Sequence, residues 1–578
     1  MKHRIVHQGQ SDWRIVVGRH ASASEIHAGK ELQRYIRKMT GVRLPVLSDR
    51  MPAGAHELIV GANEHTASKG ISVDLQQLGN EGFIIRSTED SLVLAGSNVR
   101  GTLYAVYTFL EDWLGCRWFA PGVTRIPENA TIELEPLDIC QIPTLEYRDS
   151  FSYMSFDGNW SAYNKMNGNF ARLTSHHGGK MDFTGRWVHT FNMFVPVEKY
   201  FDTHPEYFSE VNGARIADRP QLCLTNEEVL KIMIERIRDY IEEHPGINAV
   251  SVSQNDWYNP CRCANCRAID EAEGSHSGTL IAFVNKVAEA IETDYPEVAI
   301  ETLAYQYTRK PPRSVRPRHN VIVRLCSIEC CFAHPLETCE VAMSFRNRTG
   351  SDSSFASDLK AWGKISDRLH IWDYVTNFSN YVMPFPNFGV LKDNIRFFIR
   401  HNVKGIFEQG NPMKGGEFQE LRTYVIAKLL WNPDYDVDQA VNEFMKAFYG
   451  KAAPPIRAYF DLIHTKVRAE HIHMGIYDPP TSDFLPADLV AAAAELFDEA
   501  ERLADDEQIL NRVQLARLPI RYVQLSQMPT YTLNRKAMVD QFFRDVQAAG
   551  IEEIWEGRPL QKSRMFMEEG TVFKHGSL

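Results

Sequence analysis

Apolar segments alternate with helical segments over residues 143–408, and this alternation limits the fold more than any other feature of the chain. Short apolar runs predict seven strands, at 145–149, 187–191, 248–256, 298–307, 320–329, 369–374 and 403–408. Helical patterns lie between them, at 227–243, 278–292, 354–366 and 389–402. Strands that alternate with helices pair as a parallel sheet. The sequence therefore predicts an α/β fold, a (β/α)8 TIM-type barrel, whose eighth strand lies near residues 221–224.

Each of these segments ends in polar or aromatic residues. In a barrel the carboxyl ends of the strands converge on one face, and that face carries the chemistry. The residues concerned follow one another along the chain: Asp149, His189, Asp256, Tyr305, Tyr307, Glu329, Asp373 and Glu408. Their convergence predicts an enzyme.

The richest of these ends is residues 254–258, where an amide pair, a carboxylate and two aromatic side chains follow an apolar strand. Aromatic and polar groups together suit a flat, partly apolar ligand such as a sugar ring. Taken alone, Asp256 could equally cap the following loop, and Trp257 could belong to the core.

Composition narrows the class of protein. With 578 residues the chain is too long for one core, so two or three domains are expected. A net charge of -11 argues against nucleic acid as a partner. No apolar run has the roughly 20 residues of a membrane span. The N-terminus lacks the apolar core of a secretory signal, which predicts a cytoplasmic protein as written, or a secreted or periplasmic one if the chain has been trimmed. The oligomeric state stays open.

Two further regions flank the predicted barrel, which spans residues 137–416. Residues 1–136 combine short strands with two amphipathic helices, at 25–39 and 100–114, and predict a non-catalytic α+β domain. For the first helix, Ser24 is the expected N-cap and Gly41 the expected stop. Residues 417–578 predict an α-helical C-terminal region that packs against the barrel.

The first region resembles the N-terminal domain that precedes the barrel in family 20 hexosaminidases and family 67 α-glucuronidases. The segments ELQRYIRKMTG, EGFIIRSTEDSLVLAGSNVRGTLYAVYTFLE and LGCRWFAPG carry this resemblance.

The middle of the chain resembles the family once catalogued as domain of unknown function 4838 and now placed as glycoside hydrolase family 163. The segments VSVSQNDWYNPCRCANC, DEAEGSHSGTLIAFVNKVAEAIE, ETLAYQYTRKPP and VIVRLCSIECCFAHPL carry it. The resemblance implies an endo-β-N-acetylglucosaminidase that cuts within the chitobiose core of complex N-glycans. We also keep open an exo-acting β-N-acetylhexosaminidase, an α-glucuronidase-like glycosidase and an inactive carbohydrate-binding barrel.

Glycoside hydrolysis needs a carboxylic acid that protonates the leaving oxygen and a second group at the anomeric carbon. For N-acetyl sugars that second group can be the substrate's own acetamide, which gives retention. By strand order Asp256 is the expected acid/base and Asn255 the group that orients the acetamide, although family 20 enzymes carry Asp-Glu there. Glu329 is a competing acid, because its apolar neighbours would raise its pKa. Alternatively, Glu329 is a buried residue paired with Arg324 or another barrel arginine.

Further side chains are candidates for substrate binding. Aromatic rings that could stack on sugars are Trp257, Tyr258, Tyr305, Tyr307 and Trp372. Groups that could bind hydroxyls are Asp373, Glu408 and His189.

Three cysteines, Cys261, Cys263 and Cys266, have a metal-like spacing. Zinc would need a fourth ligand, for which Cys223, His276 and Cys330 are candidates. The alternatives are reduced thiols or one disulfide. No cofactor and no catalytic metal is expected, because carboxylates already explain hydrolysis.

Overall fold

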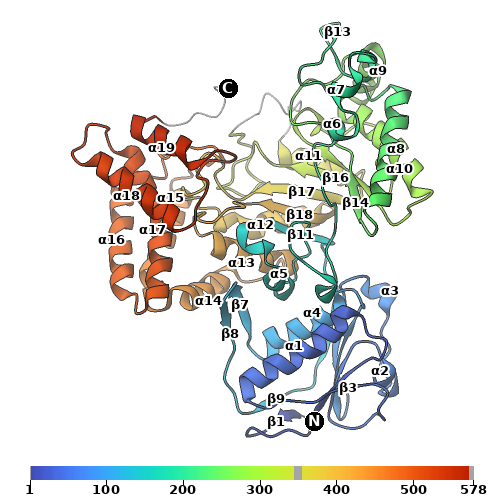
Figure 1. The fold of residues 1–578 in the computed structure, drawn as a ribbon, viewed down its shortest axis with the longest axis vertical. Helices are drawn as coiled ribbons and strands as arrows, with labels where there is room; N and C mark the ends of the chain where they lie inside the picture. Colours follow the sequence, from blue (N-terminus) through green and yellow to red (C-terminus); the bar gives the residue numbers. More distant parts are fainter. Residues whose placement is uncertain (1, 344–353, 572–578) are drawn as a thin grey trace. The chain divides into compact units, whose positions relative to one another are not determined.

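The computed structural model describes residues 2–343 and 354–571, which fall into two compact units (Figure 1). The first unit comprises Met1–Glu146, Tyr153–Lys180 and Glu420–Gly450. The second comprises Tyr147–Ser152, Met181–Gln419 and Lys451–Leu578. Because both units combine separate stretches of chain, the three-domain division expected from the sequence stays a prediction.

The first unit contains a six-stranded mixed sheet in the order β10-β5-β6-β4-β2-β3. Its strands are β2 (Arg14–Val17), β3 (Val46–Ser48), β4 (Glu57–Val60), β5 (Phe83–Ser87), β6 (Ser91–Gly96) and β10 (Asp138–Gln141). Its longer helices are α1 (Ala23–Thr40), α4 (Gly101–Thr108), most of α13 (Gln419–Trp431), and α14 (Val437–Tyr449). Strands β5 and β6 pair antiparallel as a hairpin.

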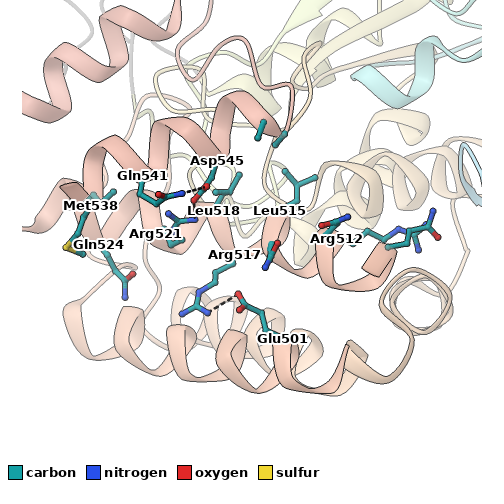
Figure 2. Close-up of a pocket in the computed structure, with 16 residues that line it drawn as sticks. Glu501, Arg512, Leu515, Arg517, Leu518, Arg521, Gln524, Met538, Gln541 and Asp545 are labelled. Carbon is teal, nitrogen blue, oxygen red and sulfur yellow. Dashed lines mark hydrogen bonds and ion pairs between the residues drawn. The ribbon is translucent and has the colours of Figure 1, made fainter. Parts of the chain in front are cut away.

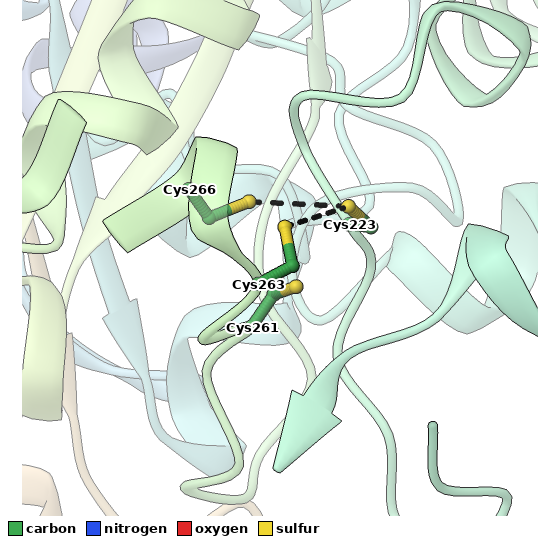
Figure 3. A group of neighbouring side chains, drawn as sticks. All are labelled: Cys223, Cys261, Cys263 and Cys266. Carbon is green, nitrogen blue, oxygen red and sulfur yellow. Dashed lines mark hydrogen bonds between the residues drawn. The ribbon is translucent and has the colours of Figure 1, made fainter. Parts of the chain in front are cut away.

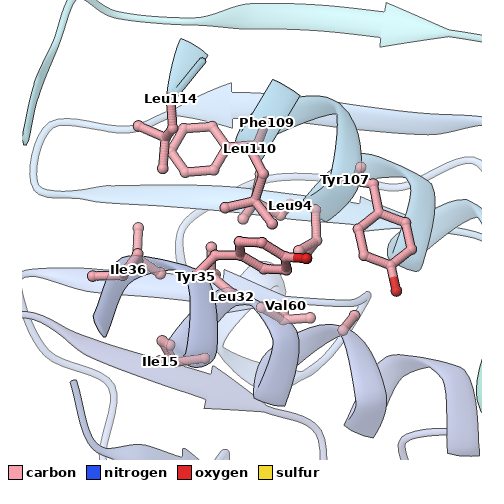
Figure 4. Close-up of a cluster of buried hydrophobic side chains, with 14 of the residues drawn as sticks. Ile15, Leu32, Tyr35, Ile36, Val60, Leu94, Tyr107, Phe109, Leu110 and Leu114 are labelled. Carbon is pink, nitrogen blue, oxygen red and sulfur yellow. The ribbon is translucent and has the colours of Figure 1, made fainter. Parts of the chain in front are cut away.

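Helices α1 and α4 bury their apolar faces against this sheet (Figure 4). Leu32 and Ile36 of α1 are fully buried, and so are Val60 and Leu94 of the strands beneath. An α-helix hides such a stripe when apolar residues recur every three or four positions. The predicted helix is therefore confirmed, and Gly41 ends it in the left-handed conformation, with φ 78°.

The N-cap of α1 differs from the prediction. Ser22 caps the helix, and its hydroxyl and the Glu25 carboxylate form a reciprocal capping box. Ser24 lies two residues further on, inside the helix, and its hydroxyl donates to the carbonyl of Val99 at 2.7 Å. Ser24 therefore ties α1 to the loop before α4 instead of capping the helix.

The second unit is organised around a six-stranded parallel sheet in the order β11-β18-β17-β16-β15-β14. The strands are β11 (Tyr147–Phe151), β14 (Ala249–Ser251), β15 (Ala299–Ala304), β16 (Val321–Cys326), β17 (Leu369–Tyr374) and β18 (Val403–Gln409). The helices of eight or more residues described along this part of the chain are α8 (Glu227–Glu243), α9 (Ala264–Glu273), α10 (Ser277–Glu292), α11 (Phe355–Trp362) and α12 (Phe388–Arg400). Six of the seven predicted strands are confirmed.

The closed eight-stranded barrel is not what the described residues form, because two of its predicted strands are absent from them. The predicted strand at 187–191 is irregular, since His189 has φ of 52°, which extended chain does not adopt. Backbone bonds still hold this segment beside β14, for example from Ser251 N to Arg186 O at 2.8 Å. At 221–224 only one bridge forms, between Phe208 and Leu222. The sheet is therefore a half-barrel.

A buried ion pair lies on the concave face of the half-barrel. The side chains of Arg324 on β16 and Glu301 on β15 are completely buried and 3.2 Å apart. The Arg324 guanidinium also lies over the ring of Phe183, 5.2 Å from its centre. It also lies 5.7 Å from the ring centre of Tyr147 on β11, at the far edge of the sheet, so the pair lies on the face that the half-barrel encloses.

The remaining helices of the second unit are α15 (Ala453–Ala469), α16 (Ala487–Leu503), α17 (Glu507–Gln527), α18 (Arg535–Ala548) and α19 (Leu560–Glu569). All five lie within residues 417–578, for which an α-helical region is predicted. Within the described residues, no helix has the length and apolarity that crossing a bilayer requires.

Candidate active site

Two solvent-accessible carboxylates, those of Asp256 and Glu556, lie near the carboxyl ends of the parallel strands. They are close enough for the negative charge of Asp256 to raise the pKa of Glu556. Asp256 lies in the loop after β14, and the Tyr305 hydroxyl donates to its Oδ1 at 3.0 Å. Tyr305 follows β15, the neighbouring strand. The structure thus brings together two residues that the sequence predicted at this edge.

Glu556 comes from the loop between α18 and α19, and sequence reasoning missed it. Its backbone N–H donates to Phe378 O at 3.0 Å, which fixes the loop beside the segment after β17. Its pKa is raised to about 7, first because the surrounding chain partly desolvates the carboxyl, which still reaches solvent, and then by the negative charges of Asp256 and Glu553. A carboxyl with such a pKa still carries its proton in about half of the molecules at neutral pH.

An aromatic and amide chain leads to Glu556. The indole of Trp372 on β17 stacks on that of Trp187, with ring centres 4.9 Å apart and planes 17° apart. Its Nε1 donates to Gln409 Oε1 at 2.8 Å, and Gln409 Nε2 donates to Glu556 Oε1 at 3.3 Å. The stacked indoles and the carboxyl group are therefore parts of one connected site.

Two tyrosines share this environment. Burial is the largest cause that raises the pKa of Tyr374 and of Tyr477, and the charge of Asp256 adds to it for both. Their phenols therefore stay neutral near neutral pH and can donate hydrogen bonds. Tyr477 comes from the loop after α15 and, like Glu556, was not among the predicted site residues.

Asn255, Trp257 and His189 bind the backbone around the loop that carries Asp256. Asn255 is buried, and its amide accepts from Asn192 N at 3.0 Å and donates to Pro220 O at 3.1 Å. The Trp257 indole donates to the same Pro220 oxygen at 2.9 Å, and His189 Nδ1 lies 2.8 Å from Gln254 O. These contacts position Asp256.

Glu329, the competing acid, forms a buried ion pair with Arg309, which also binds Asp358 at 2.7 Å. This geometry corresponds to the structural alternative, with Arg309 in place of Arg324. A carboxylate held by a buried guanidinium favours its charged form, which does not suit a proton donor.

Asp373 and Glu408 alternate with Trp372 and Gln409 along their strands, so they point to the opposite face of the sheet. They are partners in register, and both are buried. Burial raises the pKa of Asp373 to about 6, and burial followed by the Asp373 charge raises that of Glu408 well above its usual value. Asp373 and Glu408 therefore lie on the face opposite Trp372, whereas they were predicted to bind substrate hydroxyls.

The two remaining aromatic candidates lie beside the site. Tyr307 is buried, with its ring 5.7 Å from that of His276. Tyr258 is exposed and meets Tyr307 edge-on, with ring centres 5.6 Å apart. Tyr258 can reach a ligand, whereas Tyr307 supports it.

The cysteine motif gathers a fourth thiol, that of Cys223 (Figure 3). All four cysteines are buried. Of the other two candidate ligands, His276 is bonded through Nδ1 to Asp270 at 2.5 Å, and Cys330 lies in the loop after β16.

A cavity of about 960 Å³ lies among α16, α17 and α18 (Figure 2). Its charges pair within the lining, with Arg517 on Glu501 at 3.0 Å and Arg521 on Asp545 at 2.7 Å. Compensated charges of this kind do not supply a proton donor, so we place the chemistry at Asp256 and Glu556.

Residues 118–461, more than half of the chain, match the family described as domain of unknown function DUF4838. The chain belongs to the DUF4838 family. Residues 4–109 of this DUF4838 protein match the glycosyl hydrolase family 67 N-terminus. No curated protein matches it in sequence.

Solved structures resemble the DUF4838 chain in fold. A GH115 4-O-methyl-α-glucuronidase with specificity for decorated arabinogalactans is 12% identical, with 98% of this chain and 81% of that chain covered and a TM-score of 0.59. A GH138 enzyme targeting pectin rhamnogalacturonan II is 12% identical over 93% of this chain and 72% of that one, with a TM-score of 0.38, too low for an argument. The N-terminal match and the fold indicate a glycoside hydrolase.

Proposed function

We propose that this DUF4838 protein hydrolyses glycosidic bonds with Glu556 as the proton donor. The observation that carries the proposal is the position of Glu556, whose carboxyl accepts from Gln409 Nε2 at 3.3 Å at the end of β18. The nearby charge of Asp256 helps to raise its pKa to about 7. Pairs of titratable groups whose surroundings separate their pKa values are typical of acid and base roles in enzymes. The raised value lets Glu556 donate near neutral pH and accept a proton later in the cycle.

The proposed reaction has two steps. Glu556 gives its proton to the glycosidic oxygen, and the carbonyl oxygen of the substrate's acetamide attacks the anomeric carbon as the bond to the leaving sugar breaks. The Glu556 carboxylate then takes a proton from water, which attacks the same carbon and opens the cyclic intermediate. Both displacements occur at one carbon, so the configuration is retained.

In this scheme Asp256 orients the acetamide and balances the positive charge that develops on it. Its bond from Tyr305 at 3.0 Å supports this role, because a fixed carboxylate aims its second oxygen. Asn255 then positions the loop and does not touch substrate. This assignment differs from the sequence-based one, in which Asp256 was the acid and Asn255 oriented the acetamide.

The proposed substrate is the chitobiose core of N-glycans, cut by endo action. The resemblance to glycoside hydrolase family 163 is the basis for this choice. Trp187, half-buried over Trp372, supplies an aromatic face of the kind on which sugar rings stack.

An α-glucuronidase is the second candidate, because the N-terminal match and the GH115 neighbour both come from such enzymes. A uronic acid needs a cation to pair with its carboxylate. The charges that raise the pKa of Glu556 are those of Asp256 and Glu553, and the charges that raise the pKa of Tyr477 are those of Glu556 and Asp256. All of these groups are acidic. Such surroundings favour a neutral sugar.

Incubation with a glycoprotein that carries complex N-glycans, read by mass spectrometry, tests the proposal. Endo action leaves one N-acetylglucosamine on each asparagine. Loss of single terminal sugars would instead indicate exo action, and release of uronic acid from a glucuronoxylan would indicate the second candidate. Glycan binding without any cleavage would indicate an inactive barrel.

A further inference from the structure

Four buried thiols from two separate segments meet in the second unit. Cys223 precedes α8, and Cys261, Cys263 and Cys266 lie at the start of α9 (Figure 3). Their sulfur atoms all lie within 4.8 Å of one another. Free cysteines are often buried singly, but four that share one point need a reason.

The recorded separations fit a single ion. Cys223 Sγ lies 3.7 Å from Cys263 Sγ and 3.9 Å from Cys266 Sγ. Zinc binds thiolates at about 2.3 Å in a tetrahedron, whose edges are then about 3.8 Å long. Both separations therefore match the edges of a zinc tetrahedron, and the other sulfur pairs lie within 4.8 Å.

The surroundings favour thiolates. Arg215 Nη1 lies 3.5 Å from Cys261 Sγ, and the backbone N–H of Glu210 donates to the same sulfur at 3.4 Å. Cys263 is the N-cap of the ten-residue α9, so the positive end of the helix dipole faces the cluster. Donors that point at the sulfur atoms are the usual outer shell of a metal site.

We infer that Cys223, Cys261, Cys263 and Cys266 bind one structural zinc ion. The ion would join two segments that already touch around Asp256, since Gln221 Nε2 donates to Asn255 O at 2.9 Å and Pro220 O accepts from Asn255 and Trp257. With all four positions taken by protein, the ion has no site for water and takes no part in the chemistry.

The test measures zinc in the full-length chain expressed with zinc, and in Cys266→Ser. We expect zinc in a fixed ratio to protein, lost from this site in Cys266→Ser. Cys116→Ser is the matched control, because Cys116 is also buried and belongs to the other unit. X-ray absorption at the zinc edge of wild-type protein covers the case in which Cys266→Ser does not fold. Wild-type protein that holds no zinc, or zinc without sulfur ligands at about 2.3 Å, would overturn the inference.

A second cluster carries an independent inference. Cys331, His334, Cys339 and His473 place their ligand atoms within 4.8 Å of one another. Cys331 Sγ lies 3.3 Å from His334 Nδ1 and 3.4 Å from His473 Nδ1, and Cys339 Sγ lies 3.7 Å from His473 Nδ1. For tetrahedral zinc with mixed ligands, the sulfur-to-nitrogen edge is about 3.6 Å.

The geometry points to a second zinc site of the Cys2His2 type at these residues, which are less buried than the first cluster. It would clamp the loop after β16 to the loop of Tyr477, where Phe332 N already donates to Met474 O at 2.9 Å.

Two variants, each of which removes one site, distinguish the two zinc sites. In His473→Ala the remaining zinc should show sulfur ligands alone, and in Cys266→Ser the remaining zinc should show nitrogen and sulfur. Retention of the wild-type zinc ratio in His473→Ala would overturn the second site and leave the first intact. Neither readout depends on glycosidase activity, so failure of the proposed function would not affect them.

Discussion

Replacing Asp256 by asparagine should make Glu556 a stronger acid. The Glu556 pKa rises from an ordinary 4.5 to about 7, and the charge of Asp256 is the second of three causes, after burial. The Asp256 charge therefore accounts for less than half of this rise. Both side chains reach solvent, which screens the interaction further. We expect the Glu556 pKa to fall by about 0.5 to 1 pH unit in Asp256→Asn.

The assay is the pH dependence of kcat/KM, which reports groups of the free enzyme. A general acid must be protonated, so wild-type activity should fall as pH rises through about 7. In Asp256→Asn the remaining activity should fall at lower pH, because the weaker repulsion lets Glu556 lose its proton earlier. High salt should reduce the difference between the two enzymes.

Two neighbours of Glu556 serve as comparisons. Glu553→Gln removes the third cause and keeps an oxygen for the N–H of Gly557, so it should shift the alkaline limb in the same direction by less. Glu552→Gln removes an exposed charge that is not among these causes and should leave the limb in place. An alkaline limb that stays at the wild-type pH in Asp256→Asn would refute the assignment of that limb to Glu556.

Three further predictions concern other parts of the second unit. Glu329→Gln breaks a buried ion pair with Arg309 and should lower the free energy of unfolding, measured in urea, by about 3 kcal/mol. The control Glu337→Gln loses an exposed pair with Arg400 and should lower it by under about 1 kcal/mol. Equal losses in the two variants would contradict the structural role of the buried pair. Because the folded-state pKa of Asp373 is raised to about 6, its carboxyl favours the folded chain at low pH, and this contribution is lost as pH rises from about 4 to about 6. Asp373→Asn should therefore gain stability relative to wild type over that range, by up to about 3 kcal/mol, while the exposed Asp367→Asn should follow wild type throughout. Trp187→Ala should weaken glycan binding about 3- to 10-fold in calorimetry, Trp187→Phe less, and an unchanged affinity would exclude the stacked indoles as the sugar platform.

Local pattern was enough for most of the helices and strands. The helix at 227–243 was predicted with the bounds that it has, because its apolar stripe is regular and Asn226 caps it. Local pattern gave a wrong prediction at 187–191, where an apolar run suggested a strand. The left-handed conformation of His189 is set there by its bond to Gln254, far along the chain, which no local pattern contains.

The site was predicted in part for the same reason. Asp256 and Tyr305 follow strands and Trp372 lies near the end of β17, so strand order alone brings them to one edge. Strand order could not tell which face a residue takes, and Asp373 and Glu408 point away. Glu556 and Tyr477 come from loops between C-terminal helices, and only the tertiary fold brings them to Asp256.

The proton-donor role of Glu556 is the central claim, and the leaving group tests it most directly. Glu556→Gln should cleave a natural chitobiose glycoside about 10² to 10⁴ times more slowly than wild type. It should keep most of its activity on an aryl glycoside whose phenol leaves without protonation. Glu556→Gln with wild-type activity on the natural bond, or with equal losses on both substrates, would contradict the account.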